Sequence, residues 1–425
     1  MTPGRVNIVG GGIAGLLAAT ELARAGIQVA LFEKASTPGG RARTRNVEGF
    51  LLNQGPHALY RNGAFKRELD RLGVTYSGGR ELRGTRKAIW RGELYELPVS
   101  KGSLLRTRLF GIRDKIAWVR LLKSVTDGAT GGGSFSDWLD AQAISPAVRA
   151  SIEALGRLQS YANGSSAVSA AKMLEQIRMG LGGTLYVDGG WASLVSALAD
   201  AAIKAGAQVN CGAAVERMTA DNGRSKILLR DGSEHIADAV ILALSPRDAS
   251  TLAPEMASLA VEAREALPVR ANTLDLALKQ MPSGAHDFAL GVDAPLYFSI
   301  HSGSAKLAPE GGAVVHIAKY LPMGEGPARD AGEELESVAD LVMPGWREHE
   351  VARQQLRGMT VSNGLPRWDR PRPAVVLPDA AGVFIAGDWV GEEGMIADAA
   401  AASAVTAARS AIEWLSANTS RSAAA

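Results

Sequence analysis

The N-terminal stretch contains the pattern that most constrains the fold. An apolar run at Arg5–Val9 predicts a short strand, and a helical run follows from about Ile13 to Ala25. Between them, Gly10, Gly12 and Gly15 form the spacing G-x-G-x-x-G. The first glycine permits a tight turn, the second lets a pyrophosphate approach the backbone, and the third lets helix and strand pack closely. The helix then directs its positively polarised N-terminus at the phosphate.

A second strand and an acidic residue complete the unit. Gln28–Phe32 is predicted to be this strand, and Glu33 follows it. A carboxylate at this place can accept hydrogen bonds from both hydroxyls of an adenosine ribose. A plain glycine-rich turn is the alternative explanation of the glycine spacing. The strand, helix, strand and acidic residue at these distances favour a dinucleotide-binding unit of the Rossmann type.

The composition restricts the class of protein. A chain of 425 residues is too long for one ordinary domain, so we expect two. The net charge of +2 lacks the basic excess typical of nucleic-acid binding. Cys211 is the single cysteine, which excludes a disulfide framework and a cysteine-rich metal site, and we expect no metal. The sequence shows no signal pattern and no apolar run of about 18–20 residues, so we expect a cytoplasmic protein.

A paired-glycine segment carries the resemblance to a known family. Pro38–Thr44 reads PGGRART, in which Gly39 and Gly40 allow close backbone approach and Arg41 can pair with a phosphate. Together with G-x-G-x-x-G and Glu33, this segment resembles the flavin-binding entry of the superfamily that holds phytoene desaturases, flavin amine oxidases and protoporphyrinogen oxidases. The resemblance implies a non-covalently bound FAD and an FAD-dependent oxidoreductase.

Three further segments are similar to the same superfamily. Asn53–Tyr60 resembles a glycine turn that passes beside the flavin ring, with Asn53 where relatives often have an acidic residue. Tyr186–Trp191 resembles the return of the chain to the flavin domain. Val215 lies where family members hold the adenine through a valine backbone.

The last of these motifs is Val383–Ala402. A buried strand is predicted to end at Gly387-Asp388, and a helix of small residues is predicted from about Gly394. Asp388 can bond the ribityl chain or reach a phosphate through water. The helix start at Gly394–Ile396 can stabilise negative charge on the reduced flavin. The full set of expected cofactor residues is Gly10, Gly12, Ile13, Ala14, Gly15, Glu33, Lys34, Gly39, Gly40, Arg41, Gly55, Pro56, His57, Val215, Gly387, Asp388, Gly394, Met395 and Ile396.

Four residues are candidates for catalysis, with flavin N5 as the reacting centre. His57 is expected near the isoalloxazine, and the alternative is a packed, hydrogen-bonded histidine. Amine oxidases often hold a water at N5 with a lysine, a role open to Lys279 or Lys319, although a lysine at a strand edge is the favoured explanation of each position. Met395 stands where amine oxidases have an aromatic residue, which favours an apolar cavity over an aromatic amine cage.

The expected architecture is α/β, with a discontinuous Rossmann-like FAD-binding domain formed by residues 1–77, 185–266 and 360–425. Residues 78–184 and 267–359 are expected to form an inserted α+β substrate domain of helices and antiparallel sheet. Its strands include Leu296–His301 and Ala313–Tyr320, which place His301 and His316 in or beside the floor of a cavity. Residues 418–425 are expected to form a disordered tail.

Residues 101–123 are basic and amphipathic. The pattern favours a solvated helix face of the substrate domain, and peripheral contact with an anionic membrane is the alternative.

The reaction favoured by these observations is a desaturase-like or dehydrogenase-like hydride transfer from a small apolar substrate, of which isoprenoids are one class, to flavin N5. A flavin amine oxidase is the second hypothesis. A redox-neutral flavin isomerase and a non-catalytic FAD-binding protein are the remaining ones. The sequence leaves the oligomeric state and the electron acceptor open.

Overall fold

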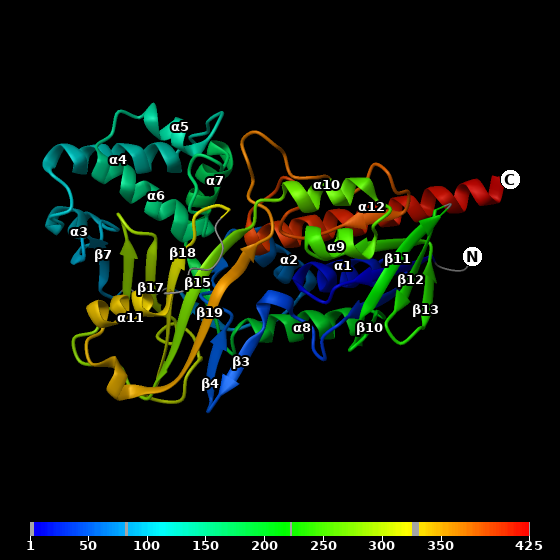
Figure 1. Cartoon of the computed structure of the whole chain (residues 1–425), viewed down its shortest axis with the longest axis horizontal. Helices are drawn as coiled ribbons and strands as arrows, with labels where there is room; N and C mark the ends of the chain where they lie inside the picture. Colours follow the sequence, from blue (N-terminus) through cyan, green and yellow to red (C-terminus); the bar gives the residue numbers. More distant parts are fainter. Residues whose placement is uncertain (1–3, 81–83, 222, 325–330, 425) are drawn as a thin grey trace.

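The computed structural model describes residues 4–80, 84–221, 223–324 and 331–424. A five-stranded parallel sheet forms the centre of one half of the molecule (Figure 1). In sheet order its strands are β10 (Gln208–Cys211), β2 (Gln28–Glu33), β1 (Arg5–Val9), β14 (Ala239–Leu242) and β20 (Val383–Ile385). The central strands β1 and β14 are almost wholly apolar and buried, as parallel strands covered on both faces must be.

Helices from distant parts of the chain cover this sheet. α1 (Ile13–Arg24) packs against α8 (Trp191–Lys204) and against the long α12 (Ile396–Ala424). α12 buries a row of alanines, including Ala404 and Ala408, and such small side chains let it lie close to α1. The expected disordered tail is wrong, because α12 continues as helix to Ala424. Shorter helices complete the layer: α2 (Ala64–Leu72), α9 (Pro246–Leu252) and α10 (Ala257–Glu265).

A mixed seven-stranded sheet forms the centre of the other half. In order it contains β19 (Glu350–Ser362), β15 (Val269–Leu278), β18 (Ala313–Tyr320), β17 (Leu296–Ile300), β16 (Phe288–Gly291), β7 (Arg86–Trp90) and β8 (Glu93–Glu96). Its pairs are antiparallel, as expected, except that β16 and β7 run parallel. α11 (Ala331–Val342) covers one face with an apolar cluster that includes Leu335 and Val338.

A helical block lies on the opposite side of this sheet from α11 (Figure 1). It contains α3 (Lys101–Arg106), α4 (Ile112–Thr126), α5 (Phe135–Asp140), α6 (Pro146–Ser160) and α7 (Ala170–Leu181). Serine side chains cap four of these helices, among them Ser134 before α5, where the predicted capping box with Asp137 is present. Within the described ranges, none of the helices has the length and apolar character that crossing a bilayer requires.

Small sheets and short turns complete the two halves. They are β3 (Thr44–Val47) with β4 (Phe50–Asn53); β5 (Leu59–Tyr60) with β9 (Thr184–Val187) and β6 (Gly78–Arg80); β11 (Val215–Asp221) with β12 (Arg224–Leu229) and β13 (Glu234–Ala237); and the short turns η1 (Gly40–Ala42) and η2 (Trp346–His349). On this topology we propose the division of the chain given above, with one change. A boundary at 359/360 would cut β19, so the second unit is better ended at Ser362.

Candidate active site

A cavity of about 660 Å³ lies where the two halves meet. Its lining residues come from the glycine-rich turn before α1, the end of β2, η1, the loop after β4, the start of α12 and the seven-stranded sheet. The predicted cofactor residues that line it are Gly10, Gly12, Ile13, Ala14, Glu33, Lys34, Gly39, Gly40, Arg41, Pro56, His57, Gly387, Asp388 and Ile396. Segments hundreds of residues apart in sequence therefore share one wall.

The glycine-rich turn contains glycines that the packing requires and one glycine, Gly12, with an open side. A Cβ at Gly15 would lie 1.9 Å from the carbonyl oxygen of Gly10, so Gly15 is needed for α1 to pack on β1. A Cβ at Gly12 would meet nothing within 4 Å. Gly12 is the N-cap of α1 and lines the cavity, so its open side is the place where a phosphate group fits against backbone N–H groups.

Glu33 is held with its carboxylate at the cavity wall. Its Oε2 accepts a hydrogen bond from the Gly11 N–H at 2.7 Å, and its Oε1 accepts one from the Ala35 N–H at 2.8 Å. Each carboxylate oxygen can accept a second hydrogen bond. The fixed carboxylate therefore retains two acceptor sites, which is what a ribose diol requires.

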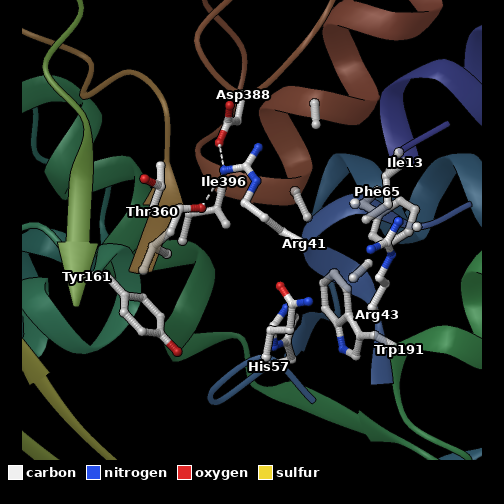
Figure 2. A pocket seen from close by; sticks show the side chains of 18 of the residues that line it. Ile13, Arg41, Arg43, His57, Phe65, Tyr161, Trp191, Thr360, Asp388 and Ile396 are labelled. Carbon is white, nitrogen blue, oxygen red and sulfur yellow. Dashed lines mark hydrogen bonds and ion pairs between the residues drawn. The ribbon is translucent and has the colours of Figure 1, made fainter. Parts of the chain in front are cut away.

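Arg41 forms an ion pair that crosses the cavity wall (Figure 2). Its Nη1 donates to Asp388 Oδ2 at 2.6 Å and to the Val361 carbonyl at 2.7 Å. Asp388 also accepts hydrogen bonds from the backbone and side-chain nitrogens of Asn363. Burial by itself would raise the pKa of Asp388, but Arg41 and Asn363 outweigh burial and the pKa is lowered. Asp388 is therefore ionised, and Arg41 keeps further N–H groups for a phosphate or a flavin oxygen.

The start of α12 is clamped and strained. Arg372 donates to the carbonyls of Asp388 and Gly394, which fixes the loop before the helix. Ile396 has φ +54°, a left-handed conformation that is rare for a β-branched residue and costs about 1–3 kcal/mol. Ile396 and Ala397 line the cavity, so a second helix N-terminus faces it. Two positively polarised helix ends suit a ligand with negative charge at the phosphates and on the reduced ring.

His57 lies against Trp191 on the same wall (Figure 2). The two rings meet edge to face with centroids 4.7 Å apart, and His57 Nδ1 donates to the Gly55 carbonyl at 3.0 Å. Burial lowers the pKa of His57, so the ring is neutral near pH 7. His57 is thus packed and hydrogen-bonded and also lines the cavity, and its place beside the isoalloxazine stays a prediction.

Seven predicted site residues do not line the cavity. Gly15, Gly55 and Gly394 act through the backbone, and Val215 lies at the start of β11. Met395 is buried in the core of the helical block, so the argument from Met395 to an apolar substrate fails.

The two candidate lysines lie away from the cavity. Lys319 pairs with Glu334 at 2.5 Å, and the backbone N–H of Lys279 donates to the His349 carbonyl at the far end of β15. The proposal that either lysine holds a water at N5 is therefore withdrawn.

The sequence did not predict the roles of Asn53 and of the aromatic residues that line the cavity. Asn53 Oδ1 accepts hydrogen bonds from the Trp191 N–H and the Thr44 hydroxyl, so Asn53 supports the start of α8 and does not face the cavity. The wall opposite the nucleotide-binding turn is formed by aromatic residues that no motif marks: Tyr161, Phe288, Tyr297 and Tyr320. His301, named above for its place beside a strand, also lines the cavity.

Comparisons with known proteins agree with this geometry. The family model for flavin containing amine oxidoreductases matches residues 13–273. The 4,4'-diapolycopen-4-al dehydrogenase of Metabacillus indicus is 23% identical over 388 residues, covering 75% of each chain. A zeta-carotene-forming phytoene desaturase of Myxococcus xanthus is 26% identical over 278 residues, covering 56% of this chain and 52% of that one. A redesigned putrescine oxidase has a similar fold, with a TM-score of 0.76, 18% identity, and coverage of 97% of this chain and 99% of that one.

The family model covers more than half of the chain, and the structural likeness extends over almost all of it. The open face of Gly12, the fixed carboxylate of Glu33 and the Arg41–Asp388 pair form a cradle that fits FAD. The chain belongs to the family of flavin containing amine oxidoreductases, and it is an FAD-dependent oxidoreductase.

Proposed function

We propose that this oxidoreductase removes a hydride from a carbon atom of an elongated apolar substrate, with isoprenoid chains as the class that fits. FAD, when bound, supplies the two-electron acceptor at N5. The residues of the chain orient the substrate and exclude water from the reacting carbon.

The observation that carries this proposal is a second cavity that lies next to the first and shares part of its wall. It has a volume of about 280 Å³ and lies between the segment before α3, the helices α4, α6 and α7, and the seven-stranded sheet. The two cavities share the wall residues Leu158, Gln159, Tyr186 and Phe288. The second cavity is lined mainly by apolar side chains, among them Leu97, Pro98, Val99, Trp118, Leu122, Leu155, Leu290 and Ile300. A long apolar molecule fits such a pair of chambers better than a short polar one does.

The chemistry of the wall also favours an apolar substrate. Tyr161 donates its hydroxyl hydrogen to the Pro56 carbonyl at 2.6 Å, and Tyr297 is hydrogen-bonded to His301 Nε2 at 3.1 Å. The hydroxyl hydrogens of Tyr161 and Tyr297 are therefore not available to donate to a polar ligand. Among the described residues, no acidic side chain of the seven-stranded sheet lines the larger cavity. A cationic amine would lack a charge partner on this wall.

Amine oxidation is the second candidate, and one observation favours it. The rings of Tyr161 and Tyr320 meet at 87° with centroids 5.3 Å apart, and aromatic rings at a cavity wall can hold a cation by their faces.

Anaerobic mixing of the FAD-loaded protein with each substrate class separates the candidates. Phytoene in lipid vesicles is the apolar probe, and putrescine is the amine probe. We expect phytoene, and not putrescine, to bleach the flavin absorbance. Leu158→Trp, which fills the junction of the two cavities, should slow this bleaching at least tenfold, whereas Ile203→Trp on the exposed face of α8 should not. Bleaching by putrescine alone would overturn the proposal in favour of amine oxidation.

We also propose that residues 101–123 contact an anionic membrane. Seven basic residues and one acidic residue lie in this segment. Leu105 and Ile112 are 76% and 79% exposed, and Ile112, Ile116 and Val119 lie on one exposed face of α4. Apolar side chains among basic ones are typical of a helix that lies in a lipid interface. The second cavity is lined by Val99, Trp118 and Leu122 of the same region, so an apolar substrate could pass from lipid into it.

Vesicle flotation tests the membrane contact. Vesicles with phosphatidylserine should bind the protein in a salt-sensitive manner, and phosphatidylcholine vesicles should bind it much less. Replacing Leu105 and Ile112 by Glu should abolish binding, whereas Ile203→Glu, at an exposed isoleucine on α8, should not. Equal flotation of both variants would refute the proposed contact.

A further inference from the structure

One face of the seven-stranded sheet is polar although it is buried. Leu274, Leu276, Val315 and Ile317 point toward α11 and form an apolar core. The alternate positions carry Asp275, His316 and Ser299, all with less than 5% of their surface exposed. Burying a carboxylate and an imidazole costs several kcal/mol unless their hydrogen bonds compensate, so packing alone gives no reason for these residues.

Asp275 and His316 form a hydrogen-bonded pair at the centre of this face. His316 Nδ1 donates to Asp275 Oδ1 at 2.6 Å. The other oxygen of Asp275 accepts from Gln354 Nε2 at 2.9 Å and from the Gly55 N–H at 3.3 Å. In the neutral form of this ring the single proton is then on Nδ1, and Nε2 is an acceptor. This Nε2 is buried and has no hydrogen-bond partner among the described residues.

His301 lies between this pair and the cavity. Its ring centroid is 4.3 Å from that of His316, and its Nε2 lies 3.1 Å from the Tyr297 hydroxyl. His301 and Tyr297 both line the cavity. If Tyr297 donates to Nε2, the proton of the neutral ring is on Nδ1, a buried atom that also lacks a partner among the described residues. The two unpartnered nitrogens are thus complementary: one is a donor and the other is an acceptor.

Burial and the neighbouring groups keep His301 and Tyr297 neutral at rest. The groups that face His301 are His316 from β18, Tyr297 from β17, Tyr186 from β9 and His57 from the loop after β4. Asp275 from β15 lies behind His316, to which it is hydrogen-bonded. The pKa of His301 lies well below its usual value, mainly because the ring is buried and then because His316 and His57 are close to it. Burial raises the pKa of Tyr297 well above its usual value. A neutral imidazole behind a protonated phenol can accept a proton from the cavity.

We propose that Tyr297, His301, His316 and Asp275 form a relay that carries away the proton lost by the substrate. The inference rests on the proposed function, because a CH–CH unit that becomes C=C loses one hydride and one proton. FAD, when bound, would accept the hydride with both electrons of one C–H bond. The second C–H bond breaks, its electrons form the new π bond, and its proton passes to the Tyr297 oxygen.

The rest of the relay conserves protons at each step. The hydroxyl hydrogen of Tyr297 moves to His301 Nε2, and the hydrogen on His301 Nδ1 moves to His316 Nε2 after a small rotation of the rings. The final state is an imidazolium of His316 beside the carboxylate of Asp275, which is a compensated ion pair. Tyr297 and His301 are the catalytic residues of this relay, and His316 and Asp275 are positioning residues that receive the charge.

Chemical rescue of the FAD-loaded protein tests the relay, with phytoene in vesicles as the substrate probe. His301→Ala should slow flavin bleaching at least about 100-fold, and Tyr297→Phe should slow it as well. His286→Ala, at a half-buried histidine outside both cavities, is the matched control and should not change the rate. Added imidazole should raise the rate of flavin bleaching by His301→Ala at least tenfold. 1-Methylimidazole accepts a proton but has no second N–H to pass on, so it should not raise this rate. Equal rescue by the two bases, or no gain from imidazole, would overturn the relay.

A second measurement needs no substrate. Ring ¹⁵N shifts of histidine-labelled, FAD-loaded protein, assigned with His301→Gln and His316→Gln, should show both rings neutral near pH 7 with the proton on Nδ1. A proton on Nε2 of either ring would overturn the relay. If phytoene fails to bleach the wild-type flavin while both rings have this tautomer, the apolar-substrate proposal fails and the arrangement of the relay stands.

Discussion

Gly12→Ala should weaken FAD binding while it leaves the stability of the fold nearly unchanged. Gly12 has φ −78° and ψ −176°, an extended conformation that alanine adopts without strain, and its Cβ would meet nothing within 4 Å. Replacing glycine by alanine at such a position stabilises by about 0.4–1 kcal/mol through the unfolded chain, while alanine is the poorer N-cap by a similar amount. The free energy of unfolding without FAD should therefore change by less than about 1 kcal/mol.

The effect on FAD should be large. The new methyl group would stand where the pyrophosphate approaches the start of α1, and two charge-assisted hydrogen bonds of about 1.5–3 kcal/mol each would be lost. Their loss, about 3–6 kcal/mol in total, corresponds to a dissociation constant raised about 10²–10⁴-fold.

Titration of FAD into the FAD-free protein, followed by flavin fluorescence, measures this constant, and urea unfolding measures the stability. Gly111→Ala is the matched control, because Gly111 is the N-cap of α4 with φ −69° and ψ 172°, also has open space at its Cβ, and lies outside the cavity. FAD affinity of Gly12→Ala equal to that of Gly111→Ala would refute the assignment of the phosphate site.

Three further predictions concern single side chains. Glu33→Ala should weaken FAD retention on a desalting column at least tenfold, since the ribose loses its acceptors; retention equal to wild type would contradict that role. Burial raises the pKa of Asp398 to about 6, so stability present below pH 4 should be lost as pH rises through 6. The loss is about 3 kcal/mol, and Asp398→Asn should abolish it in urea unfolding at pH 4 and pH 7; equal pH dependence of the two proteins would exclude this cause. Lys279→Met and Lys319→Met should leave the rate of flavin reduction within twofold of wild type, because neither lysine lines the cavity, and a hundredfold loss would restore the lysine hypothesis.

The nucleotide-binding unit could be predicted because its signals are local. The strand β1, the glycine spacing, the helix α1 and Glu33 lie within about thirty residues, and each position has its own steric or hydrogen-bonding reason. The family resemblance added FAD and the second motif at Asp388. The fold of a discontinuous Rossmann-like unit with a second sheet follows from these two ends of the chain.

The remaining features of the site depend on contacts between residues far apart in sequence. Arg41 was expected to meet a phosphate, and its pairing with Asp388, 347 positions away, has no local signal. Met395 and Ile396 are neighbours, yet the left-handed conformation of Ile396 turns one into the core and the other toward the cavity. Tyr161 faces the cavity from the C-cap of α6, where no periodic pattern marks it. Such positions become visible only when the two halves are joined.

The absorbance spectrum of the purified chain is the most direct test of the central claim that these two halves enclose one FAD. The account predicts a yellow protein that releases about one FAD per chain on denaturation and regains its colour when the FAD-free protein is dialysed against FAD. A protein that is colourless when isolated and stays colourless after dialysis against FAD would contradict the account.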